Sequence, residues 1–253
     1  YEISLGLVGS EMCIRDRSKG VDTAEILLGP FDDANEMKLK DIPENCVIKV
    51  NDRSGGSVGI KNGKIIFNNS IGDISAVDIS TGKLIWQTPT QDSSIYESSF
   101  QLKTSDLVLA NNSILFSNNT NEFYSLDTKT GILIWQKKIN STVRPTVIGD
   151  FIFTVTEDGF LVIIESETGN IIRITNVFDR IKEKNRSNIR PIGFIVGSKN
   201  IYLTTSNGRL IVVNISTGKP ILMIKVDNKN ISRPFILDKK LFIIKDSSII
   251  KLD

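Results

Sequence analysis

The sequence predicts an all-β fold of β-propeller type, an incomplete arc of about four to five four-stranded antiparallel blades from a larger ring. Three observations support this prediction. A strand-turn-strand motif recurs four times, and tight-turn signals such as Asn62-Gly63 separate the short aliphatic runs that precede its copies. No stretch of the 253 residues shows a convincing helical period of 3.6.

The repeated motif joins two apolar strands through a turn that contains Thr-Gly. Its copies read V-D-I-S-T-G-K-L-I-W (Val77 to Trp86), L-D-T-K-T-G-I-L-I-W (Leu126 to Trp135), I-E-S-E-T-G-N-I-I-R (Ile164 to Arg173) and V-N-I-S-T-G-K-P-I-L (Val213 to Leu222). Successive turn glycines lie 49, 38 and 49 residues apart. Repetition at this spacing is typical of propeller blades.

Further strands precede each Thr-Gly turn. The first strands are expected at Val58–Ile60, Leu107–Ala110, Pro145–Ile148 and Gly193–Val196, the second at Lys64–Asn69, Ser113–Ser117, Phe151–Thr156 and Ile201–Thr205, and third strands at Phe160–Glu165 and Arg209–Asn214. Lys219–Lys225 is expected to be the outermost strand of its blade, because Pro220 lacks an amide donor and suits an edge. Four antiparallel strands in about 40–45 residues form one propeller blade.

The chemistry of the turn explains its residues. Asp78 and Asp127 can accept hydrogen bonds from the backbone amides that follow them, and glycine supplies the positive φ of a tight connection. Trp86 and Trp135 are expected to pack between neighbouring blades. We interpret the whole set as a structural turn motif: Asp78, Gly82, Trp86, Asp127, Gly131, Trp135, Glu165, Gly169, Asn214 and Gly218.

These units define the expected domain organisation. Blades are predicted at about 57–105, 106–143, 144–189 and 190–231, with an incomplete blade at 232–253 built from Arg233–Leu237, Lys240–Lys245 and Ile249–Asp253. Residues 18–56 are expected to be an irregular lead-in with the remnant of a preceding blade. Residues 1–17 resemble a translated sequencing adaptor and are interpreted as non-native; the alternative is a native disordered arm.

Composition argues against several functions. The formal charge of +2 gives no bulk electrostatic reason to bind nucleic acid or a membrane. Histidine is absent, which removes the commonest general base, zinc ligand and haem ligand. Cys13 and Cys46 form neither a metal-binding pair nor a disulfide framework. We therefore expect no catalytic residue, no metal and no cofactor, and the sequence shows neither a signal peptide nor a transmembrane segment.

The D-x-x-T-G-x-x-x-W turn resembles the repeat of the pyrroloquinoline-quinone-like propeller superfamily. Within it, the segment from Gly208 to Asp253 is similar to the end of the BamB family, lipoproteins of the bacterial outer-membrane β-barrel assembly machinery. The similar elements are N-G-R-L-I-V-V-N-I-S-T-G-K-P and I-S-R-P-F-I-L-D-K-K-L-F-I-I-K-D-S-S-I-I-K-L-D. The resemblance covers roughly Asn51 to Asp253, which would be the C-terminal blades of an eight-bladed ring.

This resemblance implies a protein-binding scaffold without enzyme activity. BamB-family members are lipid-anchored at the periplasmic face of the outer membrane and hold the periplasmic domains of BamA; the anchor would lie outside this chain. Asp52 and Arg53 correspond to an acidic partner-binding loop, although Arg53-Ser54-Gly55-Gly56 departs from the family's acidic run. The alternative for Asp52 is a turn residue beside Gly55-Gly56.

Two other functions stay open. One is an interaction propeller with another partner. The other is a fragment of a quinone-dependent dehydrogenase, which would need a calcium site, a catalytic Asp and a vicinal Cys pair that this sequence lacks. The basic stretch from Phe178 to Arg190 is a further surface feature, either a contact for an acidic partner or a solvated connection between blades.

Overall fold

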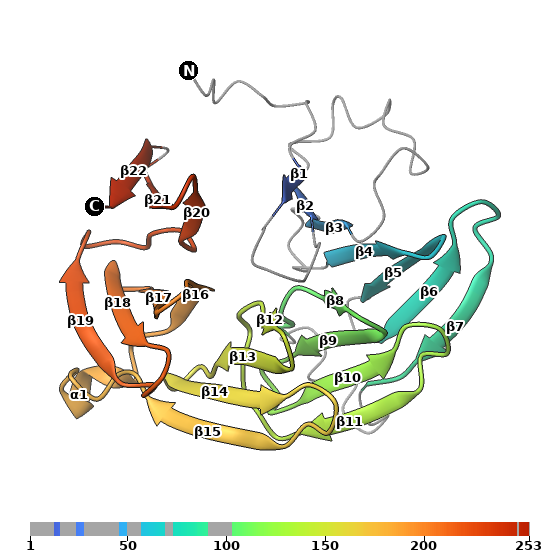
Figure 1. Cartoon of the computed structure of the whole chain (residues 1–253), viewed down its shortest axis with the longest axis horizontal. Coiled ribbons are helices and arrows are strands. Elements are labelled where there is room, and N and C mark those ends of the chain that lie inside the picture. The colour runs from blue at the N-terminus through green and yellow to red at the C-terminus, as the bar shows by residue number, and fades with distance from the viewer. Residues whose placement is uncertain are drawn as a thin grey trace. The chain divides into compact units, whose positions relative to one another are not determined.

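The computed structural model describes residues 13–15, 24–27, 46–49, 57–68, 73–90, 103–246 and 248–252. The chain divides into two compact units, Tyr1–Lys138 and Ile139–Asp253. The described residues are nearly all β, with one four-residue helix, α1 (Glu183–Arg186). Figure 1 shows the strands in chain order.

The first unit holds two sheets. One has seven strands: β1 (Cys13–Arg15), β2 (Ala24–Leu27), β3 (Cys46–Lys49), β4 (Ser57–Lys61), β5 (Lys64–Asn68), β6 (Ile74–Asp78) and β7 (Leu84–Thr88). The other has four: β8 (Val108–Ala110), β9 (Ser113–Ser117), β10 (Phe123–Asp127) and β11 (Leu133–Lys137). Each strand pairs with its neighbours in sequence, antiparallel everywhere except between β2 and β3.

The second unit holds three sheets. The first contains β12 (Thr146–Ile148), β13 (Phe151–Val155), β14 (Phe160–Glu165) and β15 (Ile171–Asn176). The second contains β16 (Pro191–Val196), β17 (Asn200–Thr205), β18 (Arg209–Asn214) and β19 (Pro220–Lys225). The third has three strands, β20 (Phe235–Leu237), β21 (Lys240–Lys245) and β22 (Ser248–Leu252). All are antiparallel meanders, so the chain is an incomplete β-propeller and β4–β7, β8–β11, β12–β15, β16–β19 and β20–β22 are its blades.

Local sequence explains why the meanders form. The turn between β4 and β5 carries Asn62 and Gly63 with φ of 50° and 69°, the left-handed pair that a two-residue hairpin requires. Each complete blade also has a register shift between its third and fourth strands, one or two residues before the Thr-Gly turn begins. The extra residue on one strand increases the local twist where the outermost strand starts.

In the first unit, the core lies between blades β4–β7 and β8–β11. Its buried side chains come from both sheets: Ile66, Ile74, Ala76, Leu107, Leu109, Ile114, Phe116, Tyr124 and Leu126. Gly59 permits this close packing, because a Cβ at that position would lie 2.7 Å from Leu109 Cδ1. The two blades therefore share one hydrophobic layer.

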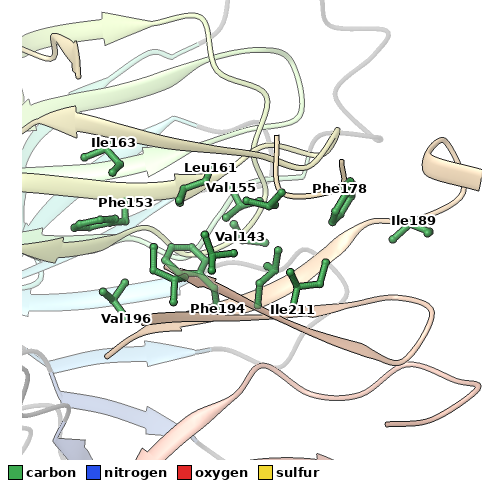
Figure 2. Close-up of a cluster of buried hydrophobic side chains, with 14 of the residues drawn as sticks. Val143, Phe153, Val155, Leu161, Ile163, Phe178, Ile189, Phe194, Val196 and Ile211 are labelled. Atoms are coloured by element: carbon green, nitrogen blue, oxygen red, sulfur yellow. The ribbon is translucent and has the colours of Figure 1, made fainter. Parts of the chain in front are cut away.

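In the second unit, a larger cluster joins blades β12–β15 and β16–β19. Figure 2 shows Phe153, Leu161 and Ile163 from the first of these blades facing Phe194 and Ile211 from the second. Phe178, in the segment between the blades, is fully buried at the edge of this cluster. The connecting segment therefore contributes to the core rather than only linking two sheets.

Candidate interaction surface

The acidic residue of each Thr-Gly turn is a hydrogen-bond acceptor for the turn itself. Asp78 Oδ1 accepts from the backbone N–H of Ser80 at 3.0 Å and of Thr81 at 2.8 Å, and also from the Thr81 hydroxyl at 2.9 Å. Asp127 Oδ1 makes the same contacts with the two residues at equivalent positions. These carboxylates lie in loop-stabilising contacts.

The later turns keep the geometry with different side chains. Glu165 accepts from the Thr168 hydroxyl, and Asn214 Oδ1 accepts from Thr217 N–H at 2.9 Å. The four turn glycines have φ between 67° and 72°, and each donates its N–H to the carbonyl of the acidic or amide residue four positions earlier. A positive φ of this size favours glycine, so backbone conformation explains the repeated Gly.

Hydrogen bonds within the turn lower the pKa of both turn aspartates, Asp78 and Asp127. The Ser80 hydroxyl, followed by the N–H and hydroxyl of Thr81, lowers the pKa of Asp78 from 3.8 to about 2. The Thr130 N–H lowers the pKa of Asp127 in the same direction. Since a general base works best with a pKa near the working pH, this arrangement suits turn stabilisation better than proton transfer.

The fourth strand of a blade packs on the turn of the next blade. Trp86 lies over Gly131, where a Cβ would come within 2.5 Å of the indole ring, and Thr88 Oγ1 donates to the Gly131 carbonyl at 2.6 Å. Trp135 is 7% exposed and stacks on Phe123 of its own blade, with ring centroids 5.7 Å apart. The tryptophans are thus packing residues in the structure.

The second unit repeats this contact without tryptophan. Arg173 takes the equivalent position, lies 3.2 Å from the site of a Cβ at Gly218 and donates from Nη1 to the Ser216 carbonyl. Leu222, the next equivalent, is 48% exposed.

The predicted partner-binding residues Asp52 and Arg53 lie outside the described residues, so their role stays a prediction. Elsewhere, the described part of the chain has no group of three or more His, Cys, Asp or Glu side chains that could hold a metal ion. Among the same residues, no helix is long and apolar enough to cross a membrane.

The basic stretch between β15 and β16 is anchored at several points. Arg186, in α1, donates from Nε to the Ile181 carbonyl at 2.8 Å and from Nη2 to the Asp179 carbonyl at 2.9 Å. Arg180 donates from Nη1 to the Ile221 carbonyl of β19 at 3.0 Å. Part of the positive charge therefore fastens this segment to its own unit, while Lys182 and Lys184 are exposed.

Sequence reasoning missed two surface features. The outer strands expose paired aliphatic side chains just after each turn, namely Leu84, Ile85, Leu133, Ile134, Ile171, Ile172, Ile221 and Leu222. Apolar character alone does not indicate exposure, but these side chains recur at the same position after each turn glycine, on the outermost strand of a blade, and that repetition was the available signal. The second feature is an Arg-Pro pair at the first strand of three successive blades, at 144–145, 190–191 and 233–234.

The fold and turns define a propeller of repeated antiparallel blades, four of which carry the same Thr-Gly turn. A family model described as "Outer membrane protein assembly factor BamB" matches residues 49–175, half of the chain. The chain belongs to this family. No curated protein sequence matches the chain.

Solved structures show the same fold at low identity. The β-propeller domain of Cps50 (Swd1) from Myceliophteria thermophila is 9% identical, with a TM-score of 0.55 over 72% of this chain and 58% of that one. Quinohemoprotein alcohol dehydrogenase ADHIIG from Pseudomonas putida HK5 is 11% identical, with a TM-score of 0.52 over 67% and 34%. BamB from Moraxella catarrhalis is 14% identical, with a TM-score of 0.49 over 77% of this chain and 70% of that one. The chain thus spans only part of each of these proteins.

Proposed function

We propose that the protein is a non-catalytic, protein-binding scaffold and a BamB-like component of outer-membrane β-barrel assembly. The observation that carries this proposal is the family match over residues 49–175. The turn geometry supports it, because Asp78 and Asp127 accept hydrogen bonds within their own turns and so have a structural role. A propeller with short connections offers broad surfaces for binding other proteins.

The proposed partner is the set of periplasmic domains of BamA. The loop at Asn51-Asp52-Arg53 is the proposed contact, with Asp52 as the carboxylate that matches the family's acidic loop. The proposed location is the periplasmic face of the outer membrane, where a lipid anchor would hold the protein. This assignment follows from the family alone.

A pull-down of a full-length version of this gene product with purified BamA periplasmic domains tests the proposal. We expect a complex that Asp52→Ala and Arg53→Ala weaken at least fivefold. Asp150→Ala, at an exposed hairpin turn, is the matched control and is expected to leave binding unchanged. Absence of any complex would favour a propeller that serves another partner.

The likeness to a quinohemoprotein dehydrogenase raises one further candidate, a quinone-dependent enzyme. Such a site needs a calcium ion held by several Asp, Glu and Asn oxygens. Among the residues that the structure describes, no three His, Cys, Asp or Glu side chains come together in a group that could hold a metal ion. Absorbance after reconstitution with calcium and pyrroloquinoline quinone tests this directly, and a stoichiometric bound cofactor would restore the enzyme hypothesis.

A further inference from the structure

Three blades of the second unit begin with the same dipeptide. Arg144-Pro145 precedes β12, Arg190-Pro191 opens β16 and Arg233-Pro234 precedes β20. These are the first strands of their sheets, and Figure 1 shows β16 on the opposite side of its sheet from the outer strand β19. Proline fixes its own φ and favours an extended residue before it. The dipeptide therefore gives all three arginines the same backbone preference, each at the beginning of the first strand of its blade.

Arg233 is positioned by the neighbouring blade. Its side chain crosses Gly193 of β16, where a Cβ would lie 2.7 Å from Arg233 Cγ, and its Nε donates to the Phe194 carbonyl at 3.2 Å. Glycine at position 193 leaves room for the arginine stem, and the hydrogen bond sets its direction. A half-buried guanidinium held in this way loses little freedom when it binds an anion.

Arg190 is held on the adjacent blade and keeps about half of its side chain exposed, 49%. Its Nε lies 3.5 Å from Glu157 Oε2, and its Nη1 donates to the Ser187 carbonyl at 3.0 Å. Glu157 also accepts a hydrogen bond from the Thr142 hydroxyl, which fixes that carboxylate to blade β12–β15. Arg190 is thus oriented by Glu157 of blade β12–β15 and by Ser187 of the connecting segment, and Arg144 takes the equivalent sequence position one blade earlier.

The charge balance decides which anion these arginines suit. The chain has 31 Lys and Arg against 29 Asp and Glu, so it lacks the extended positive field that nucleic acids or anionic membranes require. Instead, the Arg-Pro pairs place one guanidinium at the start of each of the three blades of the second unit, so these charges are spaced apart. A planar guanidinium matches a single carboxylate through two parallel hydrogen bonds. Spaced arginines therefore favour a chain that carries carboxylates at intervals.

We propose that Arg144, Arg190 and Arg233 bind an acidic segment of a partner protein, with one carboxylate for each blade. This inference rests on the proposed scaffold function and adds the chemical class of the bound segment. Packed sheets lie about 10 Å apart, and an extended chain advances about 3.3–3.6 Å per residue. An acidic side chain at roughly every third position would therefore meet successive blades.

Fluorescence anisotropy with the full chain tests this proposal. The probe is a labelled peptide with Glu at every third position and Ser or Gly elsewhere, and its partner peptide has the same composition with the Glu residues adjacent. We expect the triple variant Arg144→Gln, Arg190→Gln, Arg233→Gln to bind the spaced peptide at least tenfold more weakly. Arg233→Lys keeps the positive charge but loses the forked donor geometry of the guanidinium. Its affinity for the spaced peptide is expected to lie between those of wild type and the triple variant.

The matched control removes the same charge elsewhere in the unit. Lys182→Gln, Lys184→Gln, Lys199→Gln changes three exposed lysines and is expected to alter affinity less than twofold. Circular dichroism confirms that each variant is folded. Unchanged binding in the arginine variant, an equal loss in the lysine variant, or equal affinity for the clustered peptide would overturn the proposal. Arginine-dependent binding to vesicles of one part phosphatidylglycerol to three parts phosphatidylcholine, without peptide binding, would also overturn it.

The result is separable from the BamA experiment. Arginine-dependent peptide binding without a BamA complex would remove the proposed partner and keep this inference. A BamA complex unaffected by the arginine variant, with no binding of the spaced peptide, would keep the proposed function and remove this inference.

Discussion

Gly82 and Gly131 have nearly the same backbone, with φ of 67° and 72°, but different surroundings. A Cβ at Gly82 would meet nothing within 4 Å, whereas one at Gly131 would collide with Trp86 and Thr88 of the preceding blade. Comparing the two positions therefore separates the need for a left-handed residue from the need for space. The difference between the losses in unfolding free energy at the two glycines measures the contact between neighbouring blades.

We expect Gly82→Ala to lower the free energy of unfolding by about 1 kcal/mol, the cost of a left-handed alanine. Gly131→Ala should cost about 3 kcal/mol, because overpacking adds about 1–3 kcal/mol to that strain. Urea unfolding followed by tryptophan fluorescence measures both. Equal losses at the two positions would show that Trp86 does not press on the turn.

The turn aspartates predict a pH dependence. The pKa of Asp78 is about 2 in the folded chain against an ordinary 3.8, so its ionised form stabilises the fold above about pH 4. That contribution is lost as the pH falls from about 4 towards 2. We expect wild type to be more stable than Asp78→Asn at pH 7 and the difference to shrink across this window. Urea midpoints at pH 7, 4 and 3 test it, and a constant difference would contradict it.

The sequence predicted residues whose role is local and missed those whose role depends on neighbours. The roles of Gly131 and Asp127 can be predicted from the sequence of the turn that contains them. Arg233 cannot, because its position depends on Gly193 of another blade, 40 residues earlier in the chain. The repeated Arg-Pro pair was the available signal in the sequence. Asp52 and Arg53 stay predictions.

Strand boundaries followed closely from the turn signals. Residues 64–69 were expected as one strand, and β5 covers Lys64–Asn68; residues 233–237 were expected as another, and β20 covers Phe235–Leu237. The parallel pair of β2 and β3 could not be predicted, because no local pattern marks a pairing across a long connection. Nor could α1, since four residues are too few to show a helical period. β1 falls within the segment interpreted as non-native, an interpretation that stays a prediction.

An exposed isoleucine on the outer strand β15 and a buried one on the adjacent strand should differ in how well they tolerate a charge. Ile174 is 57% exposed on β15, whereas Ile164 on the adjacent β14 is fully buried. We expect Ile174→Lys to change the free energy of unfolding by less than about 0.5 kcal/mol and to reduce self-association, because charge protects an edge strand. Ile164→Lys should prevent stable folding. Urea unfolding and light scattering distinguish the two, and unchanged scattering in Ile174→Lys would show that this edge does not self-associate.

The segment between β15 and β16 depends on one buried ring. Phe178 is fully buried, and a Cβ at Gly159 would lie 2.2 Å from that ring. We expect Phe178→Ala to cost about 3–5 kcal/mol through the cavity that it leaves and to speed tryptic cleavage between Arg180 and Arg186. Asn185→Ala, an exposed change in the same segment, is the control. Cleavage at the same rate in Phe178→Ala and wild type would show that the segment is anchored by its hydrogen bonds alone.

At the scale of the whole molecule, stability is divided between cores that each join two neighbouring blades. The first unit has the cluster around Phe116, and the second has the cluster around Phe194. No residue is shared between these two clusters. In repeat architectures of this kind, a local change weakens its own blade and the next before it affects distant ones. We therefore expect each pair of blades to undergo local unfolding separately from the other.

Hydrogen exchange with mass spectrometry tests that expectation with variants already introduced. Gly131→Ala places its clash between blades β4–β7 and β8–β11, so we expect faster exchange in β6–β11 and wild-type exchange in β16–β19. Phe178→Ala acts on the other cluster and should give the reverse pattern. The reciprocal pair excludes a general effect of lower stability, because each variant is the control for the other. If both variants accelerated exchange equally in all blades, the chain would unfold as one cooperative unit, and binding at one blade would then stabilise every other.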